Sequence, residues 1–204
     1  MKSANDGYIK FQLKWIKGRP VPSAKIKKLN QWRKKLYGLG LIGLYNNGIG
    51  FGNLSVRSGK TGNFIITGSE TGRFKILSAN HYARVVGHNF EKNRLTCRGP
   101  IKASSESLSH AIIYRMDKNI NYVMHLHNLK LWKKLKNKVP TTSAKAAYGT
   151  PEMAWEIEKL FKQTDVKDKH ILVMAGHREG LMTFGSDAET AGKAVLRFMG
   201  QREI

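Results

Sequence analysis

The sequence has one cysteine, few acidic residues and no long apolar run. The single cysteine, Cys97, cannot form an internal disulfide, which excludes a disulfide-stapled scaffold and agrees with a reducing compartment. No apolar run approaches the roughly 18 residues that a membrane-spanning helix needs. The N-terminal segment MKSANDGYIKFQ also lacks the apolar stretch of a signal peptide. We therefore expect a cytoplasmic protein with no membrane partner.

Acidic residues are scarce relative to basic ones. Lys and Arg number 36 against 14 Asp and Glu, which gives a formal net charge of +22. Such an excess attracts nucleic acid, acidic membranes or phosphorylated metabolites through its long-range field. The lysines are spread, however, with densest runs at 10–35, 130–138 and 159–169, and there is no RNP-like aromatic run, zinc-finger cysteine spacing or leucine-zipper heptad pattern. We therefore expect at most a salt-sensitive, sequence-indifferent affinity for nucleic acid.

The length and the order of elements predict one layered domain. A chain of 204 residues can bury one substantial core, so we expect a single domain over 1–204. Apolar patterns predict strands at 8–16, 52–57, 63–67, 81–89, 94–99, 123–128, 170–177 and 179–185, and helices at 23–38, 104–116, 129–138, 150–161 and from 186 onward. This mixture lacks strict βαβ alternation. It predicts an α/β (α+β) layered fold with a central, mainly antiparallel sheet flanked by helices, and with 1–22 as an N-terminal strand extension.

Several helix starts carry capping signals. Ser23 is a plausible N-cap of the first helix, and Ser104 or Ser105 of the second. The segment Ser186-Asp187-Ala188-Glu189 has the form of a capping box for the last helix. Helical spacing predicts two buried stripes, Ile26, Leu29, Trp32 and Leu36 in the first helix and Leu108, Ala111, Ile112 and Met116 in the second.

The segment VMHLHN contains a candidate metal site. A strand points residues two apart to the same face, so the imidazoles of His125 and His127 converge while the apolar residues between them face a core. A catalytic zinc usually has three protein ligands and one open position. The best third candidate is His177, which ends the strand-forming run ILVMAGH before a turn that contains glycine. His81 and His88 have no partner pattern, and we expect structural or surface roles for them.

Two glycine-containing loops and one helix start can bind a small anion. The segments LYNNGIGFGNLSVR and GSETGRF match neither the phosphate loop of NTPases nor a dinucleotide fingerprint. They do expose backbone N–H groups, and Asn53, Thr71 and Gly72 can meet an anion there. The hydroxyls and free N–H groups around Ser104 and Ser105 add a second set of donors. Glu106 lies beside them, and from the residues alone its simplest role is to complement the helix dipole.

Taken together and in order, GNLSVR, TGSETG, ASSES, HLH and AGHREG resemble the class II aldolase and adducin-head family over roughly residues 25–200. The resemblance implies a central antiparallel sheet flanked by helices, a zinc held by three histidines, and a homotetramer with active sites between subunits. It assigns by position His125, His127 and His177 as zinc ligands, Glu106 as the acid/base, and Asn53, Thr71, Gly72, Ser104 and Ser105 as the residues that hold a substrate phosphate.

The resemblance implies a zinc-dependent lyase that cleaves a small phosphorylated ketose. In such a reaction zinc stabilises the enediolate left when the carbon–carbon bond breaks, and Glu106 moves the proton. A pentulose-phosphate 4-epimerase or a methylthioribulose-phosphate dehydratase would use the same zinc and phosphate geometry. Outside the enzymes, the alternatives are a non-catalytic adducin-head-like module and a basic nucleic-acid-binding module. The intact histidine trio and Glu106 argue against the adducin-like alternative.

Two segments depart from the family pattern. The familiar third histidine is followed directly by glycine, whereas this chain has His177-Arg178-Glu179-Gly180, a turn two residues longer from which Arg178 can enter the cleft. The family's aldolases also carry a tyrosine shortly after a proline downstream of the histidine pair. Here Pro140 is followed by a shorter segment, and Tyr148 matches a later aromatic residue. We therefore do not transfer that tyrosine to this chain, nor the fuculose phosphate that one of the best known aldolases of the family cleaves.

Overall fold

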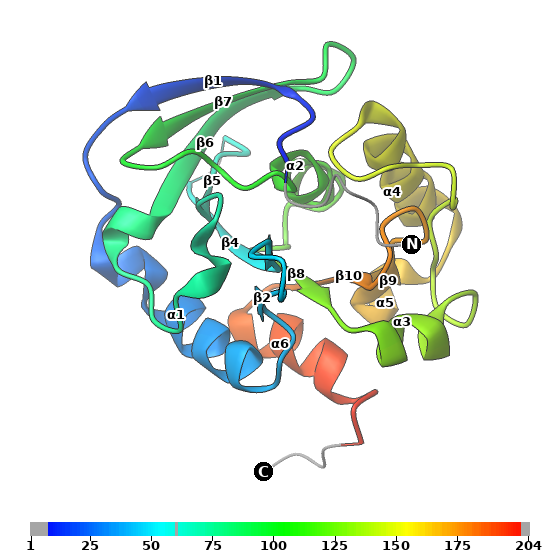
Figure 1. Ribbon diagram of the computed structural model, residues 1–204. Helices are drawn as coiled ribbons and strands as arrows, with labels where there is room; N and C mark the ends of the chain where they lie inside the picture. Colours follow the sequence, from blue (N-terminus) through cyan, green and yellow to red (C-terminus); the bar gives the residue numbers. More distant parts are fainter. Residues whose placement is uncertain (1–7, 60, 201–204) are drawn as a thin grey trace.

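One mixed sheet organises the residues that the structure, a computed structural model, describes, namely 8–59 and 61–200 (Figure 1). Its eight described strands are β1 (Gln12–Lys17), β4 (Asn53–Arg57), β5 (Phe64–Thr67), β6 (Tyr82–Asn89), β7 (Arg94–Gly99), β8 (Tyr122–His127), β9 (Ile171–Val173) and β10 (Gly180–Gly185). Their spatial order is β1-β7-β6-β5-β4-β8-β10-β9. Of these pairings only β1 with β7 is parallel, which confirms the predicted layered α/β fold with a mainly antiparallel sheet.

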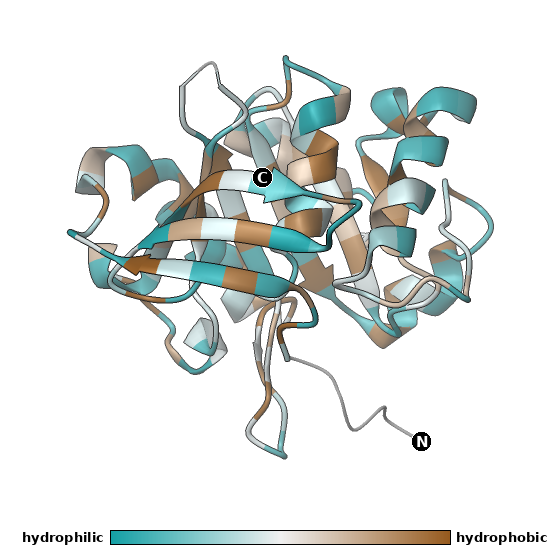
Figure 2. Ribbon diagram, turned by 90° about the horizontal axis from the view of Figure 1, so that it is seen from above, coloured by the Kyte–Doolittle hydropathy of each residue, from teal (hydrophilic) through white to brown (hydrophobic). Residues whose placement is uncertain are grey.

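Helices cover both faces of this sheet (Figures 1 and 2). They are α1 (Ser23–Gly38), α2 (Ser107–Met116), α3 (Leu129–Leu135), α4 (Pro151–Gln163), α5 (Val166–Lys169) and α6 (Ala188–Leu196), with short 3-10 turns η1 (Thr71–Arg73) and η2 (Ala79–His81). One core joins α2 and α4 to the sheet through residues such as Ile112 and Ile157. The other core joins α1 and α6 to the opposite face through Leu29 and Ala191. None of the described helices has the length and apolarity that crossing a membrane requires.

The central strand β8 alternates between the two cores, as its sequence predicts. Val123 belongs to the core around α2, whereas Met124 and Leu126 belong to the core around α1. Because successive strand residues point to opposite faces, His125 and His127 share the side of Val123. A small separate hairpin of β2 (Gly43–Leu44) and β3 (Gly50–Phe51) precedes β4, the neighbour of β8.

The N-terminal extension is the edge strand of the same sheet. β1 pairs in parallel with β7, with Trp15 opposite Cys97, and the indole N–H of Trp15 donates to the carbonyl oxygen of Gly99 at 3.0 Å. The strand occupies Gln12–Lys17, so it begins four residues later than the predicted 8–16. Residues 1–7 of the expected extension lie outside the described part of the chain.

Two predicted helix caps are wrong. Pro22 has an extended backbone and is the N-cap of α1, so Ser23 is already the first helical residue. The predicted buried stripe of this helix is nevertheless confirmed. In α6 the cap is Asp187, whose carboxylate accepts the Thr190 N–H at 2.8 Å. Glu189 does not complete a capping box, because the cap at Asp187 makes Thr190 the third helical residue. The Glu189 carboxylate instead accepts the indole N–H of Trp32 at 3.1 Å.

Helix α2 begins later and is buried more completely than predicted. The carbonyl of Ser104 accepts both the N–H and the hydroxyl of Ser107, which makes a separate turn before the helix. Glu106 is therefore the N-cap position, and neither Ser104 nor Ser105 is. Every residue from Ser107 to Tyr114 is buried, because α2 is enclosed between the sheet and α4 and not exposed along one side.

Candidate metal and substrate site

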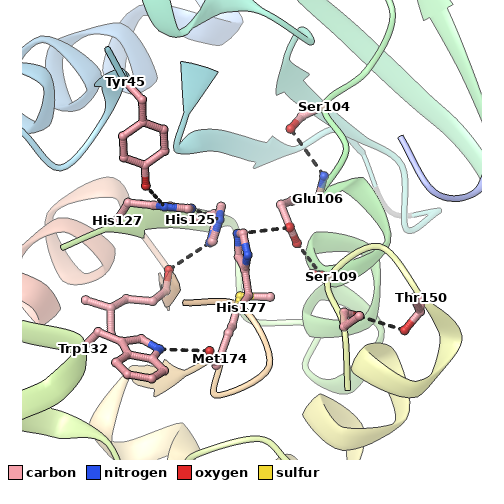
Figure 3. Close-up of polar contacts among 12 residues, drawn as sticks. Tyr45, Ser104, Glu106, Ser109, His125, His127, Trp132, Thr150, Met174 and His177 are labelled. Atoms are coloured by element: carbon pink, nitrogen blue, oxygen red, sulfur yellow. Dashed lines mark hydrogen bonds and ion pairs between the residues drawn. The ribbon is translucent and has the colours of Figure 1, made fainter. Parts of the chain in front are cut away.

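Three histidines from two parts of the chain meet beside the sheet (Figure 3). His125 and His127 come from β8, and His177 lies in the turn between β9 and β10. Trp132 supports this turn by donating its indole N–H to the carbonyl of Met174 at 3.0 Å. One ring nitrogen of each histidine lies within 4.8 Å of the others, and all three residues are buried. The structure thus brings together the three residues that the sequence singled out as metal ligands.

Gly180 makes the close approach of two of these rings possible. A Cβ atom at this position would lie 2.7 Å from the Cδ2 atom of His177 and 3.2 Å from the Cε1 atom of His125. Both distances are shorter than an ordinary carbon–carbon contact of about 3.5–4.0 Å. Any other residue at position 180 would therefore push the imidazoles apart.

Hydrogen bonds hold His127 in one tautomer. The hydroxyl of Tyr45 donates to Oε2 of Glu179 at 2.8 Å, and the oxygen of the same hydroxyl lies 2.8 Å from Nδ1 of His127. Since the tyrosine hydrogen is directed to Glu179, its oxygen can accept only from a protonated Nδ1. The Nε2 atom of His127 is consequently left with a bare lone pair.

His125 is held in the matching tautomer. Its Nδ1 lies 3.2 Å from the carbonyl oxygen of Leu181, which can only accept, so this nitrogen carries the hydrogen and Nε2 is bare. The two Nε2 atoms of His125 and His127 face each other at 2.9 Å. Two lone pairs at this distance repel each other unless a positive charge lies beside them. The donor set therefore fits a divalent cation, and the contacts with the Tyr45 hydroxyl and the Leu181 carbonyl orient the imidazoles toward it.

Burial keeps the three imidazoles neutral. It lowers the pKa of His125 to about 4 and holds the pKa values of His127 and His177 well below the ordinary value of 6.5. The neighbouring His125 lowers the pKa of both other rings further. Because a metal binds the unprotonated nitrogen, the cluster is ready to coordinate an ion at neutral pH without first losing protons.

Glu106 places a buried carboxylate next to the histidines. It is 2% exposed, and its Oε1 lies 3.7 Å from Nε2 of His177 (Figure 3). The hydroxyl of Ser109, one turn along α2, donates to the other oxygen at 2.8 Å and fixes the orientation of the group. A carboxylate in this position can exchange a proton with a molecule bound at the histidines.

The residues predicted to hold a phosphate line one cavity beside the histidines. Asn53, Thr71, Gly72, Ser104 and Ser105 all line it, together with four further glycine and serine residues of the same loops and with Glu70. The adjoining cavity, which contains the three histidines and Glu106, shares Asn53 and Ser105 with it. A molecule spanning both cavities would have one end in the anion-type pocket and the other at the histidines.

The polar groups of this cavity differ in what they offer a ligand. Oδ1 of Asn53, an acceptor, is buried without a hydrogen-bond partner among the described residues, so it can accept from a ligand hydroxyl and does not bind the anion itself. The hydroxyl of Thr71 donates to the carbonyl of Gly68 at 2.9 Å, which leaves backbone N–H groups as the donors of this loop. The left-handed Glu70 followed by the right-handed turn η1 gives the backbone form of an anion-binding nest.

A buried arginine supports the cavity from behind. Arg33 of α1, 2% exposed, donates to the carbonyls of Thr71 and Lys75 at 3.0 and 3.1 Å. Burial lowers the pKa of Arg33, but from an ordinary value of 12.5, so the side chain remains charged. It therefore fixes the loop of η1 and adds a positive charge near the expected anion. Helical spacing puts Arg33 four residues after Leu29, on the buried side, and this was the available signal for its role.

Sequence reasoning missed Tyr45 and Lys10. Tyr45 lies in the glycine-rich segment without periodicity, 82 residues from His127, so nothing local pointed to it. The ring of Tyr148 lies 4.6 Å from that of His177, and the amine of Lys10 lies 3.8 Å from the centre of the Tyr148 ring. Tyr148 thus enters the site, whereas Arg178 is exposed and does not line it. In the longer turn it is Glu179 that reaches the site, through Tyr45.

The other two singled-out histidines lie elsewhere. Nδ1 of His81 accepts the backbone N–H of Ser78 at 3.0 Å in the turn η2. His88 packs edge-on against Phe90 with 4.9 Å between ring centres. Both therefore have local structural surroundings, as their lack of a partner pattern suggested.

The sheet and its histidine-lined cavity define a class II aldolase-type fold. The chain belongs to the class II aldolase and adducin family, because the model of the Class II Aldolase and Adducin N-terminal domain matches residues 39–198. No curated protein sequence matches the chain.

Solved structures share the fold at low sequence identity. An L-fuculose 1-phosphate aldolase superposes with a TM-score of 0.64 at 18% identity, over 91% of this chain and 92% of that chain. A sugar-phosphate aldolase from Thermotoga maritima gives 0.60 at 15% identity, over 88% and 97%. YgbL from Klebsiella pneumoniae, described as an aldolase, epimerase or decarboxylase, gives 0.61 at 17% identity, over 89% and 92%. At these identities the likeness establishes the fold, and the activity has to be argued from the site.

Proposed function

We propose that this protein is a zinc-dependent lyase that cleaves a small phosphorylated ketose. The observation that carries the proposal is the 2.9 Å distance between the Nε2 atoms of His125 and His127, from which the neighbouring hydrogen bonds direct the ring hydrogens away, with His177 completing a buried trio. Three neutral imidazoles are a common ligand set for zinc that keeps a position open for substrate. A carboxylate and an anion-type cavity adjoin this trio, which is what cleavage of a phosphorylated substrate requires.

The residues of the two cavities have separate tasks in this proposal. The N–H groups around Thr71 and Gly72, with Ser104 and Ser105, bind the phosphate and so orient the carbon chain toward the histidines. A zinc ion bound by the three histidines would supply the Lewis-acid charge that stabilises the negative oxygen developing during cleavage. Glu106 takes or returns the proton, held in place by Ser109. Tyr148 covers His177 and helps to exclude water.

The same site geometry also serves an epimerase or a dehydratase. We favour the lyase because Glu106 is, among the described residues that line the histidine cavity, the one carboxylate, so a single carboxylate acid/base faces the substrate. The homotetramer implied by the family resemblance stays a prediction, and sedimentation analysis of the purified protein tests it.

The direct test is a screen of phosphorylated ketoses with metal-free protein reloaded with zinc. We expect aldehyde release by the zinc-loaded wild type and no release by His177→Ala prepared in the same way. A change of configuration with the carbon chain intact would replace the lyase by an epimerase. If zinc-saturated protein transforms none of the ketoses, the proposed lyase function is wrong, even if the metal site is real.

A further inference from the structure

A second hollow on the surface is lined by basic residues and lies apart from the candidate site. Its walls come from the end of β1, the following loop and the strands β6 and β7. Its charged members are Arg19, Arg84, Arg98 and Lys17, although the amine of Lys17 lies 5.6 Å from the centre of the Trp15 ring, on the other side of β1. We call the surface formed by Lys17, the loop Gly18–Val21, Arg84 and Arg98 the basic groove. It shares no lining residue with the two cavities beside the histidines.

Two arginines of the groove stand directly opposite each other. Arg84 of β6 pairs in register with Arg98 of β7, which in turn faces Ile16 of β1. Like charges in such a cross-strand pair are destabilising unless an anion lies between them. The Nε atom of Arg84 is also buried without a hydrogen-bond partner in the described part of the chain. Two arginines thus leave neighbouring strands at the same level of the sheet, and Arg84 has an unused buried donor.

No carboxylate neutralises this cluster within residues 8–59 and 61–200. The residues lining the groove include no Asp or Glu, and none of its four cations takes part in an ion pair there. The sequence explains this, because it has no acidic residue from position 7 to position 69, a stretch that contains 12 Lys and Arg. An external anion is therefore the remaining way to compensate the charge.

The positive surface continues beyond the groove. The loop Gly18–Val21 leads directly into α1, where Lys25, Lys27 and Lys28 of the first turns are exposed. One small phosphorylated molecule would neutralise the groove but leave these lysines without a partner. An extended polyanion can contact both. Nucleic acid presents regularly spaced phosphates and gains affinity from each cation that displaces a counterion.

We propose that the basic groove binds the phosphodiester backbone of nucleic acid, with Arg84 and Arg98 contacting phosphate oxygens. Arginine suits this role because its planar fork of N–H donors binds phosphate bidentately. The residues lining the groove include no aromatic side chain on which a base could stack, and Trp15 points to the other face of β1 from Ile16. The binding is therefore indifferent to base sequence.

The test uses the full-length protein and short DNA duplexes of two unrelated sequences over a range of salt concentrations. We expect equal affinity for both duplexes and a linear fall of log K with log salt. The double variant Arg84→Gln/Arg98→Gln should reduce the steepness of that line by about 2, roughly 1 for each lost phosphate contact. The matched control Lys159→Ala/Lys167→Ala removes the same charge from α4 and α5, which lie in Figure 1 on the opposite side from the ends of β1 and β7, and should leave the slope unchanged.

A charge-reversal variant keeps the test informative if the double variant is destabilised. Arg98→Glu should form a favourable cross-strand pair with Arg84, so its thermal midpoint should not fall while its DNA affinity and salt slope fall as in the double variant. Equal loss of binding in the lysine control would show a diffuse field and overturn the proposal. Binding of inorganic tripolyphosphate as tightly as the duplexes would assign the groove to a small anion instead. In all variants the zinc content of the histidine site should stay at the wild-type value. The result for the basic groove is therefore independent of the result for the proposed lyase function.

Discussion

At the scale of residues, the hydroxyl of Tyr45 decides which nitrogen of His127 is available. It connects His127 to Glu179, a residue in the left-handed region with φ of 73°. A side chain of this size in that conformation is unfavourable, and a glycine would relieve the strain. The carboxylate contact at 2.8 Å is the compensating gain. Of the two residues that lengthen the turn after His177, Glu179 thus acts on the metal site through a hydrogen bond, whereas Arg178 is exposed.

Replacement of Tyr45 by Phe should weaken metal binding without changing the ligands. His127 loses the acceptor that keeps the hydrogen on Nδ1, and outer-sphere partners of this kind are worth about 10–100-fold in metal affinity. Glu179→Gln should show a smaller loss, because the amide oxygen can still accept from Tyr45. Competition with a chromophoric chelator measures both, with the exposed Tyr8→Phe as the control. Wild-type affinity in Tyr45→Phe would show that the hydrogen bond does not orient His127.

The variant Glu106→Gln distinguishes a catalytic role of Glu106 from a structural one. Glu106→Gln keeps the shape and can still accept from Ser109, but it cannot exchange a proton at neutral pH. We expect the fold, zinc and ligand binding to be retained and kcat to fall by about 10²–10⁴-fold. Glu70→Gln, which removes the exposed carboxylate of the neighbouring cavity, is the matched control and should keep its turnover.

A different outcome would assign Glu106 to the helix alone. A carboxylate that only complements the dipole of α2 is worth about 0.3–1 kcal/mol of stability and does not affect the rate. Turnover of a confirmed substrate by Glu106→Gln at close to the wild-type rate would therefore end the proposed acid/base mechanism.

At the scale of elements, Gly72 joins the turn η1 to the β2–β3 hairpin. A Cβ atom at Gly72 would lie 2.3 Å from the carbonyl oxygen of Gly43 and 2.7 Å from the Cα atom of Gly50. These neighbours are backbone atoms, so they can give way only if the hairpin moves. Gly72 is needed for this packing whatever its part in phosphate binding.

The variant Gly72→Ala should open the anion-type cavity. We expect a loss of about 1–3 kcal/mol in unfolding free energy from overpacking, with weaker phosphate binding measured by calorimetry. Gly38→Ala is the control, since a Cβ there meets nothing within 4 Å, and it should not destabilise the protein. Unchanged phosphate binding in Gly72→Ala would separate this loop from the anion site.

The sequence predicted the elements better than their ends. Period-2 and helical patterns identified β8 and α1, because they reflect which side of an element is buried. The caps were less predictable. Whether Ser23 or Pro22 ends the loop, and whether Asp187 or Ser186 accepts the first N–H, depends on backbone angles that neighbouring residues set. The complete burial of α2 depends on α4, which lies far along the chain. Arg115 of α2 and Glu158 of α4, which form a hydrogen bond, are 43 residues apart.

The candidate site was predictable where its residues lie close together in the sequence. His125 and His127 are two residues apart on one strand, so their convergence is a local property. His177 and Glu106 approach them only through the pairing of β10 with β8 and the placement of α2, and the family resemblance supplied their assignment. Tyr45 acts through a contact across 82 residues, which no local pattern records. Helical spacing puts Arg33 on the buried side of α1, but nothing local points to its partner Thr71, 38 residues away.

At the scale of the whole molecule, buried neutral histidines make the free energy of unfolding depend on pH. Burial lowers the pKa of His110, which bonds to the Ser55 hydroxyl at 2.7 Å, well below its ordinary value, as it does for the three site histidines. Above pH 6.5 neither state binds these protons. As pH falls below 6.5 the unfolded chain takes them up and the folded protein does not, so stability is lost.

The metal-free protein should therefore become less stable between pH 6.5 and 5.5. Each buried histidine contributes a loss of up to about 1.4 kcal/mol per pH unit. His110→Gln should be less stable at every pH, since it disturbs a buried network, but should lose less on acidification. Urea unfolding at several pH values measures the difference. A variant with the full wild-type pH dependence would mean that His110 is protonated in the folded protein.

The proposed function depends most on the metal site. The direct measurement is the amount of zinc bound per chain when zinc is titrated into the metal-free protein. We expect about one zinc per chain for the wild type and loss of tight binding in His125→Ala, His127→Ala and His177→Ala, because each removes one of three ligands. His88→Ala, which removes a histidine away from the cluster, should bind as the wild type does. Stoichiometric zinc at wild-type affinity in all three ligand variants would contradict the central claim.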